Sequence, residues 1–366
     1  IGRLIVKFAV PSVIALLVNS LYNIVDQIFI GQGVGMLGNA ATNIAFPLST
    51  SCTAISLLLG IGRATNFSLK LGAGEEKESA EYAGNGICLM AIFGIALFAV
   101  TTIFLTPMLK FFGATSEVLP YAQEYTRITA IGFPFLIANT GMSKLILADG
   151  SPRYSMTSML VGAIVNTILD PIFIFVLDMG IKGAAIATVI SQILSALLVF
   201  YFLHGKSELK VRWIHINEIS ECTRHARDII SLGSAGFIMQ LTNSLVSICC
   251  NNVLSVTGGD IYISVMTIIS SVRQMVETPI HAINEGTSPV LSYNYGARRP
   301  DRVKKAGVVL IIMVLIYTGI MWSVILIAPE FLIGIFSSDK LLLKDAVPAL
   351  KLYFAAFIFM DLQYIG

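Results

Sequence analysis

Two acidic side chains lie inside long apolar runs, where an ionised carboxylate is costly. Asp26 lies late in the first run, and Asp170 lies near the end of the fifth, four residues after Asn166. Residues four apart share one face of a helix, so Asn166 and Asp170 can address one cation or proton. Pro171 lacks an N–H, which leaves the carbonyl of Thr167 free as a further acceptor. Charged groups at mid-membrane depth cost at least ~2.5 to 3.5 kcal/mol on insertion scales, so these residues are functional candidates.

Two carboxyl groups in one dry pocket repel each other until a proton or a metal cation neutralises the pair. Oxygen ligands suit Na⁺ as well as H⁺, so either ion could bind, and no other cofactor is expected. Release of the ion would return charge to the pocket and could change its shape. A purely structural role stays open, in which Asp170 caps a helix end and Asp26 bonds to Tyr22 or Asn23.

The second half of the chain offers a different polar set. Arg273 and Glu277 are four residues apart and could either pair with each other or line a cavity. Gln240 and Asn243 are neutral candidates nearby, and Asp361 is an acid well inside the tenth run.

Soft and aromatic side chains could line an adaptable cavity for a ligand, although most such residues in so apolar a chain face lipid or neighbouring helices. The candidates are Tyr22, Met142, Met239, Met266 and Met275. Arg63, at the end of the second run, is expected to be an interfacial cation that snorkels to the membrane surface.

These residues lie in a chain of 366 residues that is 55% hydrophobic and 13% charged, with a mean hydropathy of +0.80. A soluble domain carries roughly 25% charge, so a water-soluble globular protein is excluded. Ten apolar runs are long enough to cross a bilayer, and they lack the alternation of barrel strands. The sequence therefore predicts an all-α membrane protein. The cores of the runs are 5–30, 40–66, 84–109, 119–146, 153–177, 183–204, 228–256, 261–289, 306–328 and 346–366.

Other classes find little support in the sequence. The net charge of +2 gives no basic excess for nucleic acid, and neither a zinc-type cysteine pair nor a phosphate loop occurs. The five cysteines are odd in number and lie mostly in apolar runs, which is typical of reduced packing residues. The four histidines are scattered, so an enzyme is disfavoured. The first run is too long for a signal-peptide core and is expected to be a retained span.

The loops between the runs carry an uneven distribution of cations. If the loops alternate sides, sixteen Lys and Arg residues fall on one side and four on the other. This bias predicts that the amino terminus and the 205–225 loop lie in the cytoplasm.

The chain also repeats itself. Gly62 and Gly72 recur as Gly286 and Gly296, each 224 residues later. Both copies start on the same side, which predicts parallel repeats with a binding site between them. The second copy stops at Gly366, so two helices of a twelve-helix plan are expected to be missing from this chain. The predicted division is an amino-terminal lobe at 1–204, a loop at 205–225 and a carboxy-terminal lobe at 226–366.

An ordered set of motifs on this duplicated plan resembles the multidrug and toxic compound extrusion (MATE) transporters, nearer their bacterial multidrug-export and DNA-damage-inducible branches. The motifs are Leu21-Tyr22-Asn23-Ile24-Val25-Asp26, Gly60-Ile61-Gly62, Leu71-Gly72-Ala73-Gly74, Ala148-Asp149-Gly150-Ser151-Pro152 and Ser292-Tyr293-Asn294-Tyr295-Gly296-Ala297. The resemblance implies two six-helix lobes that alternate between inward-facing and outward-facing states. It also implies an exporter of amphipathic, often cationic compounds in exchange for H⁺ or Na⁺, acting as a monomer in the bacterial inner membrane.

The resemblance further implies a cation site in the amino-terminal lobe. In some family members this site consists of an acid in the first span, an Asn-x-x-x-Asp motif in the fifth and a threonine in the sixth. The matching residues in this chain are Asp26, Asn166, Asp170 and Thr188. A Thr188 hydroxyl bonded to its own helix is an equally simple reading. The seventh span carries no acid, which departs from the sodium-coupled branch of the family.

Two other functions remain open at this point. A flippase for lipid-linked sugars shares the duplicated plan, but it would favour several cations in the central cavity, where only Arg273 and Arg63 are candidates. A channel or a membrane scaffold is the second alternative, although the asymmetric acid pair favours a coupled carrier.

Overall fold

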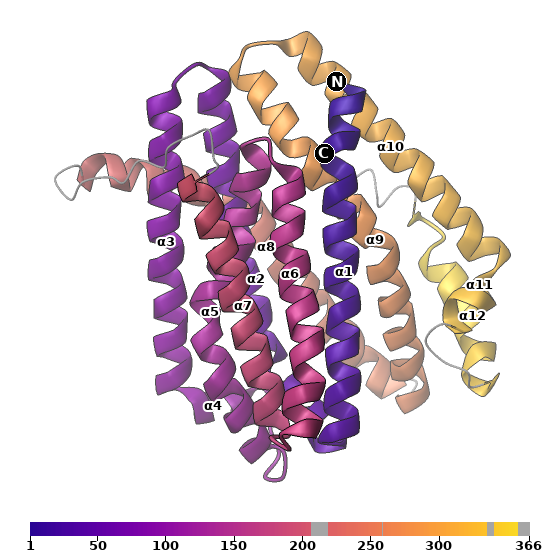
Figure 1. Ribbon diagram of the computed structural model, residues 1–366. Coiled ribbons are helices and arrows are strands. Elements are labelled where there is room, and N and C mark those ends of the chain that lie inside the picture. Colours follow the sequence, from indigo (N-terminus) through magenta and orange to yellow (C-terminus); the bar gives the residue numbers. More distant parts are fainter. Residues whose placement is uncertain (206–218, 258, 335–339, 358–366) are drawn as a thin grey trace. The chain divides into compact units, whose positions relative to one another are not determined.

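The computed structural model describes residues 1–205, 219–257, 259–334 and 340–357, and this part of the chain is almost entirely helical, with no strand (Figure 1). The predicted all-α architecture is therefore confirmed. The elements are α1 (Gly2–Gly33), α2 (Met36–Gly72), α3 (Glu76–Ile103), α4 (Leu105–Phe111), α5 (Leu119–Ala148), α6 (Pro152–Pro171), the π-helix η1 (Ile172–Val176), α7 (Ile181–Gly205), α8 (Ile219–Thr257), α9 (Gly259–Gly296), α10 (Pro300–Ile327), α11 (Pro329–Gly334) and α12 (Lys340–Tyr353).

Seven of the described segments are long and apolar enough to cross a membrane, namely α1, α2, α3, α5, α6 with η1, α7 and α10. Two further runs, 228–256 and 261–289, form the long helices α8 and α9. The run 84–109 is not one helix, because α3 ends at Ile103 and α4 begins at Leu105. Pro107 explains the break, since its ring clashes with the preceding turn and it cannot donate to the carbonyl of Ile103. The chain is a multi-pass membrane protein.

The chain forms two compact units, which are described separately here. Unit 1 contains Ile1–Leu17, Leu241–Leu291 and Arg299–Gly366, and unit 2 contains Val18–Gln240 and Ser292–Arg298. The division falls within α1, α8 and α9. The predicted lobe boundaries at 204 and 226 stay a prediction.

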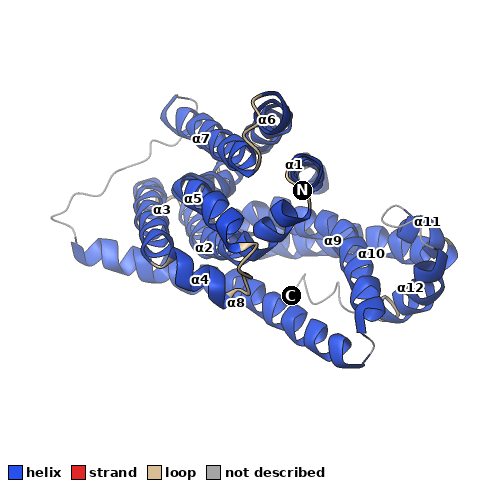
Figure 2. Ribbon diagram, turned by 90° about the horizontal axis from the view of Figure 1, so that it is seen from below, coloured by secondary structure: helices blue, strands red, loops and turns tan. Residues whose placement is uncertain are grey.

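In unit 2, α5 is the central helix and packs against α2, α3 and α7, while α6 packs against α7 (Figure 2). Small residues bring α2 and α5 close together, since a Cβ on Gly60 would lie 2.9 Å from the Cα of Gly141. The core between these helices is apolar, with Phe67, Met90 and Ile137 almost fully buried. This bundle gives rigid support to the side chains at its surface and its ends.

Arg63 corrects one expectation. Its side chain is fully buried in unit 2, where Nη2 donates to the carbonyl of Gly141 at 3.0 Å, and Gly86 leaves room for its stem. The prediction of an interfacial, snorkelling cation was wrong because α2 continues nine residues beyond Arg63, to Gly72. Arg63 therefore lies more than two turns inside the helix.

Glycines of the two copies make reciprocal backbone contacts. In unit 2, a Cβ on Gly72 would collide with the carbonyl of Tyr293, and a Cβ on Gly296 would collide with the carbonyl of Leu69. Tyr293 and Gly296 stand 224 residues after Leu69 and Gly72. The ends of α2 and α9 thus meet through equivalent residues, as a duplicated chain would produce.

A second glycine contact follows the same offset. Gly62 of α2 lies against the carbonyl of Ile229 at the start of α8, and Gly233 lies against the carbonyl of Leu58. In unit 1, Gly286 of α9 lies against the backbone of Ala9 in α1. Each copy's second helix thus rests on the first turns of the other copy's first helix.

The core of unit 1 is apolar and lies between α9, α10, α11 and α12. Its buried residues include Val276, Val314 and Leu350, and Ala9 of α1 joins them. The indole N–H of Trp322 donates to the carbonyl of Phe354 at 3.0 Å, which ties α10 to the residues after α12.

Candidate functional site

The predicted acid pair comes together in unit 2. Asp26 of α1 is 8% exposed, and Asp170 at the end of α6 is fully buried. The two carboxyl groups are close enough to interact directly. Asn166 is 2% exposed, and its Nδ2 donates to Oδ1 of Asp170 at 3.3 Å, as the spacing of four residues predicted. Two acids and one amide therefore share a buried site.

This site holds more acceptors than donors. Oδ1 of Asp26, Oδ1 of Asn166 and Oδ2 of Asp170 are all buried, and none has a hydrogen-bond partner among the described residues. A buried acceptor without a donor destabilises a structure by about 1 to 3 kcal/mol, and more when it carries charge. The arrangement can therefore accept a proton, or a small cation that prefers oxygen.

Two tyrosines lie within electrostatic range of both acids. Tyr22 stands one turn before Asp26 on α1, and Tyr125 comes from α5. Tyr22 was predicted to line a ligand cavity, and the structure puts it beside the acid pair. Tyr125 was not predicted, because only the packing of α5 brings it here.

A polar contact from α2 reaches the same place. Gln27 interacts with the neighbouring Asp26, and the hydroxyl of Thr42 donates to Oε1 of Gln27 at 3.0 Å. Gln27 follows Asp26 directly in the sequence and could have been noted there. Thr42 gives no such signal, because its role depends on how α1 and α2 pack.

The backbone beside Asp170 is irregular. α6 ends at Pro171, and the chain continues as a single turn of π-helix, η1, to Val176. Short π-helical turns occur often at functional sites. Pro171 supplies a physical cause, because it removes one hydrogen bond from the helix.

An apolar cluster closes the site toward the end of α1. Ile30 of α1, Ile174 of η1 and Ala184 of α7 are buried together, and the rings of Phe29 and Phe175 meet edge to face at 6.2 Å. Ile30 stands one helical turn after Asp26, so the cluster separates the acids from this end of unit 2.

Thr188 does not join the acids directly. It lies half-buried on α7, which packs along α6. Its hydroxyl makes no hydrogen bond to Asp26, Asn166 or Asp170 in the described part of the chain. Its predicted role as a ligand stays a prediction.

The polar set of the second half is partly described. Arg273 and Glu277 of α9 pair at 4.0 Å, with Glu277 8% exposed at its side chain, and Tyr353 of α12 lies beside both. Gln240 and Asn243 lie one turn apart on α8 and are half-buried. Asp361 lies outside the described residues.

The methionines predicted to line a cavity lie in different surroundings. Met142 is 1% exposed and packs in the core of unit 2, and Met266 packs against the core of unit 1. Met239 and Met275 are 40% and 39% exposed. Among the described residues no group of three or more His, Cys, Asp or Glu side chains could hold a metal ion.

The chain is similar along its whole length to proteins already known. A family model described as MatE matches residues 11–172 and 236–366, one match for each predicted copy. The multidrug export protein MepA of Staphylococcus haemolyticus (strain JCSC1435) is 25% identical over 365 residues, which cover 100% of this chain and 80% of that protein. MepA of Staphylococcus aureus (strain NCTC 8325 / PS 47) is 25% identical over 363 residues, with coverages of 99% and 80%.

Solved structures agree with these sequence matches. The outward-facing conformation of a multidrug resistance MATE family transporter of the MOP superfamily superposes with a TM-score of 0.87 at 26% identity, over 96% of this chain and 78% of that one. A MOP superfamily transporter from Pyrococcus furiosus, whose binding pocket is described as having reverse polarity, gives a TM-score of 0.87 at 25% identity and the same coverages.

Proposed function

Because the chain belongs to the MatE family of multidrug and toxic compound extrusion transporters, we propose that it exports amphipathic organic compounds in exchange for inward movement of H⁺ or Na⁺. The export function is supported by its relatives, which are named multidrug export proteins. The ion coupling is supported by the buried acids. The proposed location is the bacterial inner membrane.

One observation carries the coupling proposal: three buried oxygens of Asp26, Asn166 and Asp170 lack a donor among the described residues. The carboxyl groups of Asp26 and Asp170 interact directly, so if both were ionised they would repel each other in this medium of low dielectric. One bound proton or cation removes most of that repulsion. The site thus favours an occupied state over an empty, doubly charged one.

Occupancy of this site can act on α1. Asp26 and Tyr22 belong to α1, whereas Asp170 belongs to α6 and Tyr125 to α5. When the ion leaves, the repulsion between the two carboxylates acts between α1 and α6. The hydroxyl groups of Tyr22 and Tyr125 can then donate hydrogen bonds to the acids. The part of α1 near Asp26 is the element expected to shift, since its rigid neighbours belong to the bundle. Such a two-state element is what alternating access needs.

The lipid-linked sugar flippase finds less support. That function needs cations able to hold a diphosphate, and Arg63 was one of two candidates. Arg63 is buried inside unit 2 and donates to a backbone carbonyl, so it is not available to a ligand. Arg273 pairs with Glu277 instead.

Transport of a fluorescent organic cation tests the proposal. The intact transporter in proteoliposomes should move the dye only when a proton or sodium gradient of the right direction is imposed. Separate proton and sodium gradients identify the ion. Transport that continues after both gradients are collapsed would contradict the coupling, while leaving the export activity in place.

The orientation gives a second expected result. A cysteine at Lys210, within the 205–225 loop, should react with an impermeant maleimide only in inside-out vesicles, because the cation bias favours a cytoplasmic loop. A cysteine at Lys182, which is 54% exposed at the start of α7, should react only in intact cells. The opposite pattern at both positions would reverse the proposed topology.

A further inference from the structure

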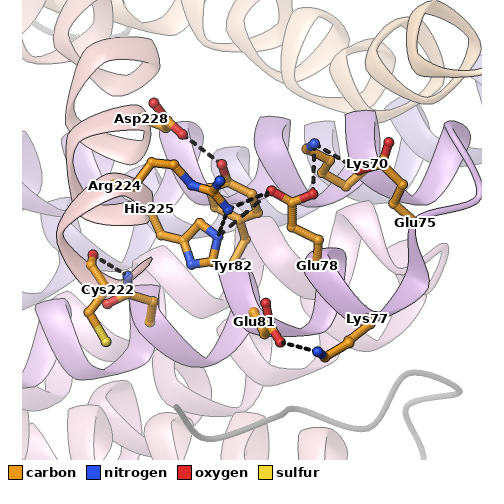
Figure 3. A network of polar contacts seen from close by, with 11 residues as sticks. Lys70, Glu75, Lys77, Glu78, Glu81, Tyr82, Cys222, Arg224, His225 and Asp228 are labelled. Carbon is orange, nitrogen blue, oxygen red and sulfur yellow. Dashed lines mark hydrogen bonds and ion pairs between the residues drawn. The ribbon is translucent and has the colours of Figure 1, made fainter. Parts of the chain in front are cut away.

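A second polar cluster joins the start of α8 to the start of α3 (Figure 3). It shares no residue with the acid pair. Glu78 of α3 is its centre. One of its oxygens lies 2.8 Å from Nζ of Lys70, and the other lies 3.2 Å from Nη2 of Arg224. All these residues belong to unit 2. The cluster ties the first turns of α8, which begins at Ile219, to α3.

Three more contacts join the same two helices. The hydroxyl of Tyr82 donates to Oδ2 of Asp228 at 2.7 Å, and Nδ2 of Asn85 donates to the carbonyl of Cys222 at 2.8 Å. The rings of Tyr82 and His225 lie 4.2 Å apart at their centroids, inclined by 49°. Figure 3 shows His225 and Arg224 facing Tyr82 and Glu78. The contacts follow one face of α3 at helical spacing.

His225 is the buried member of the cluster. Its side chain is fully buried, and Nε2 lies 3.3 Å from Nη2 of Arg224. A guanidinium group can only donate, so Nε2 must accept and His225 must be neutral in this geometry. A second proton would turn Nε2 into a donor, remove this hydrogen bond and put a cation beside Arg224, a cost that Glu78, whose Oε1 lies 3.8 Å from Nε2, offsets in part.

The balance of charges around His225 agrees with this reading. His225 lies in the first turns of α8, before the apolar run 228–256. Burial and then Arg224 lower the pKa of His225 from its ordinary value of 6.5, against the opposite effects of Glu78, Glu81 and Glu221. The contact that holds α8 is therefore strongest above the ordinary pKa and weakens as the pH falls through the lowered value.

The ion pair between Glu78 and Arg224 can part at modest cost. The side chains of Glu78 and Arg224 are 24% and 58% exposed, so water can replace their partners when they part. Exposed ion pairs contribute only about 0.2 to 1 kcal/mol each. Tyr82 and His225 are buried, and Ile229 packs with Tyr82 in the core of unit 2, so the latch opens at the turns of α8 before Ile229.

We propose that Glu78, Tyr82, Arg224, His225 and Asp228 form a latch that holds the start of α8 on α3, opens once in each transport cycle, and weakens when His225 takes up a proton. The latch rests on the proposed function, because only a transporter that alternates needs this contact to open. These residues act by positioning α8, and they touch neither substrate nor coupling ion. An acidified cytoplasm would thus release the latch.

Cys222 is a native reporter for the latch, because it is half-buried and its carbonyl accepts from Asn85. In a variant that keeps only this cysteine, the rate of labelling by an impermeant maleimide measures how often the start of α8 leaves α3. Glu78→Gln should raise the rate about fivefold at neutral pH, and Tyr82→Phe about twofold.

Matched controls accompany these variants. Arg227→Gln removes an exposed cation of the same helix that has no ion pair in the described part of the chain, and it should leave the rate unchanged. Tyr154→Phe removes a tyrosine hydrogen bond to Leu198 within the α6–α7 pair and should also have no effect. Equal rates in Glu78→Gln and in the parent, or an equal rise in Arg227→Gln, would overturn the latch.

The histidine has its own test. Between about pH 7.5 and about pH 5.5, labelling of the parent should accelerate relative to His225→Gln, which cannot take up a proton. The intrinsic pH dependence of the thiol cancels in this ratio. An unchanged ratio would overturn the role of His225. Labelling needs no ion gradient, so failure of the latch is distinguishable from failure of coupling, which Asp26 variants report.

Discussion

Asp26→Asn should abolish ion-driven export, a loss of about tenfold or more, while the protein still inserts and binds some drug. Asparagine keeps the volume of the side chain and removes only the charge that binds the ion. Asp26 faces Asp170, and its Oδ1 has no donor among the described residues, so the change removes repulsion without leaving a hole. Dye export in proteoliposomes across a range of pH, with and without Na⁺, measures the effect.

The double variant makes this prediction sharper. If Asp26 and Asp170 form one site, Asp26→Asn combined with Asp170→Asn should be little worse than either single change, because residues that act as a unit are not additive. Asp178→Asn is the control, since Asp178 lies beyond η1 and outside the acid site. Near-normal coupled export by Asp26→Asn would refute the site. Two mild defects that simply add would show that the acids act separately.

Gly62→Ala should destabilise the protein by about 2 kcal/mol, within the range measured for overpacked interiors. A Cβ at this position would collide with the carbonyl of Ile229, which is backbone and cannot move aside alone. α2 and α8 would have to separate. The temperature of unfolding in detergent, followed by size-exclusion chromatography with fluorescence detection, reports the loss.

Gly307→Ala in α10 is the matched control. A Cβ there has nothing within 4 Å, and alanine favours a helix over glycine by up to about 1 kcal/mol. Its unfolding temperature should therefore stay unchanged or rise slightly. A Gly62→Ala variant as stable as the parent would show that the two helices are held less tightly than the backbone contact indicates.

The local parts of this structure could be predicted from the sequence. A span of about 20 apolar residues determines a membrane helix by itself. Asn166 and Asp170 were recognised because their spacing fixes them on one face of one helix, whatever surrounds it. Asp26 was recognised because an acid is costly in such a segment, and its closeness to Asp170 followed from the family resemblance.

The parts that depend on packing could not be predicted. Tyr125 and Thr42 reach the acid pair from α5 and α2, and nothing in their own segments shows it. Hydropathy also hides polar extensions of helices: α8 begins at Ile219, not near 228, so Arg224 and His225 were assigned to a loop. The same error put Arg63 at a membrane surface, because α2 continues past the apolar run to Gly72.

The reciprocal glycines restrict how the two copies of this gene segment can drift apart. Gly72 meets the carbonyl of Tyr293 and Gly296 meets that of Leu69, so a larger residue in either copy disturbs both. The residues that follow these glycines differ between the copies. There are four glutamates and one lysine in 75–81, whereas the equivalent 299–305 contains four Lys or Arg residues and one aspartate. Duplication thus left the first turns of α3 and α10 able to take opposite charge beside helix ends that had to stay the same.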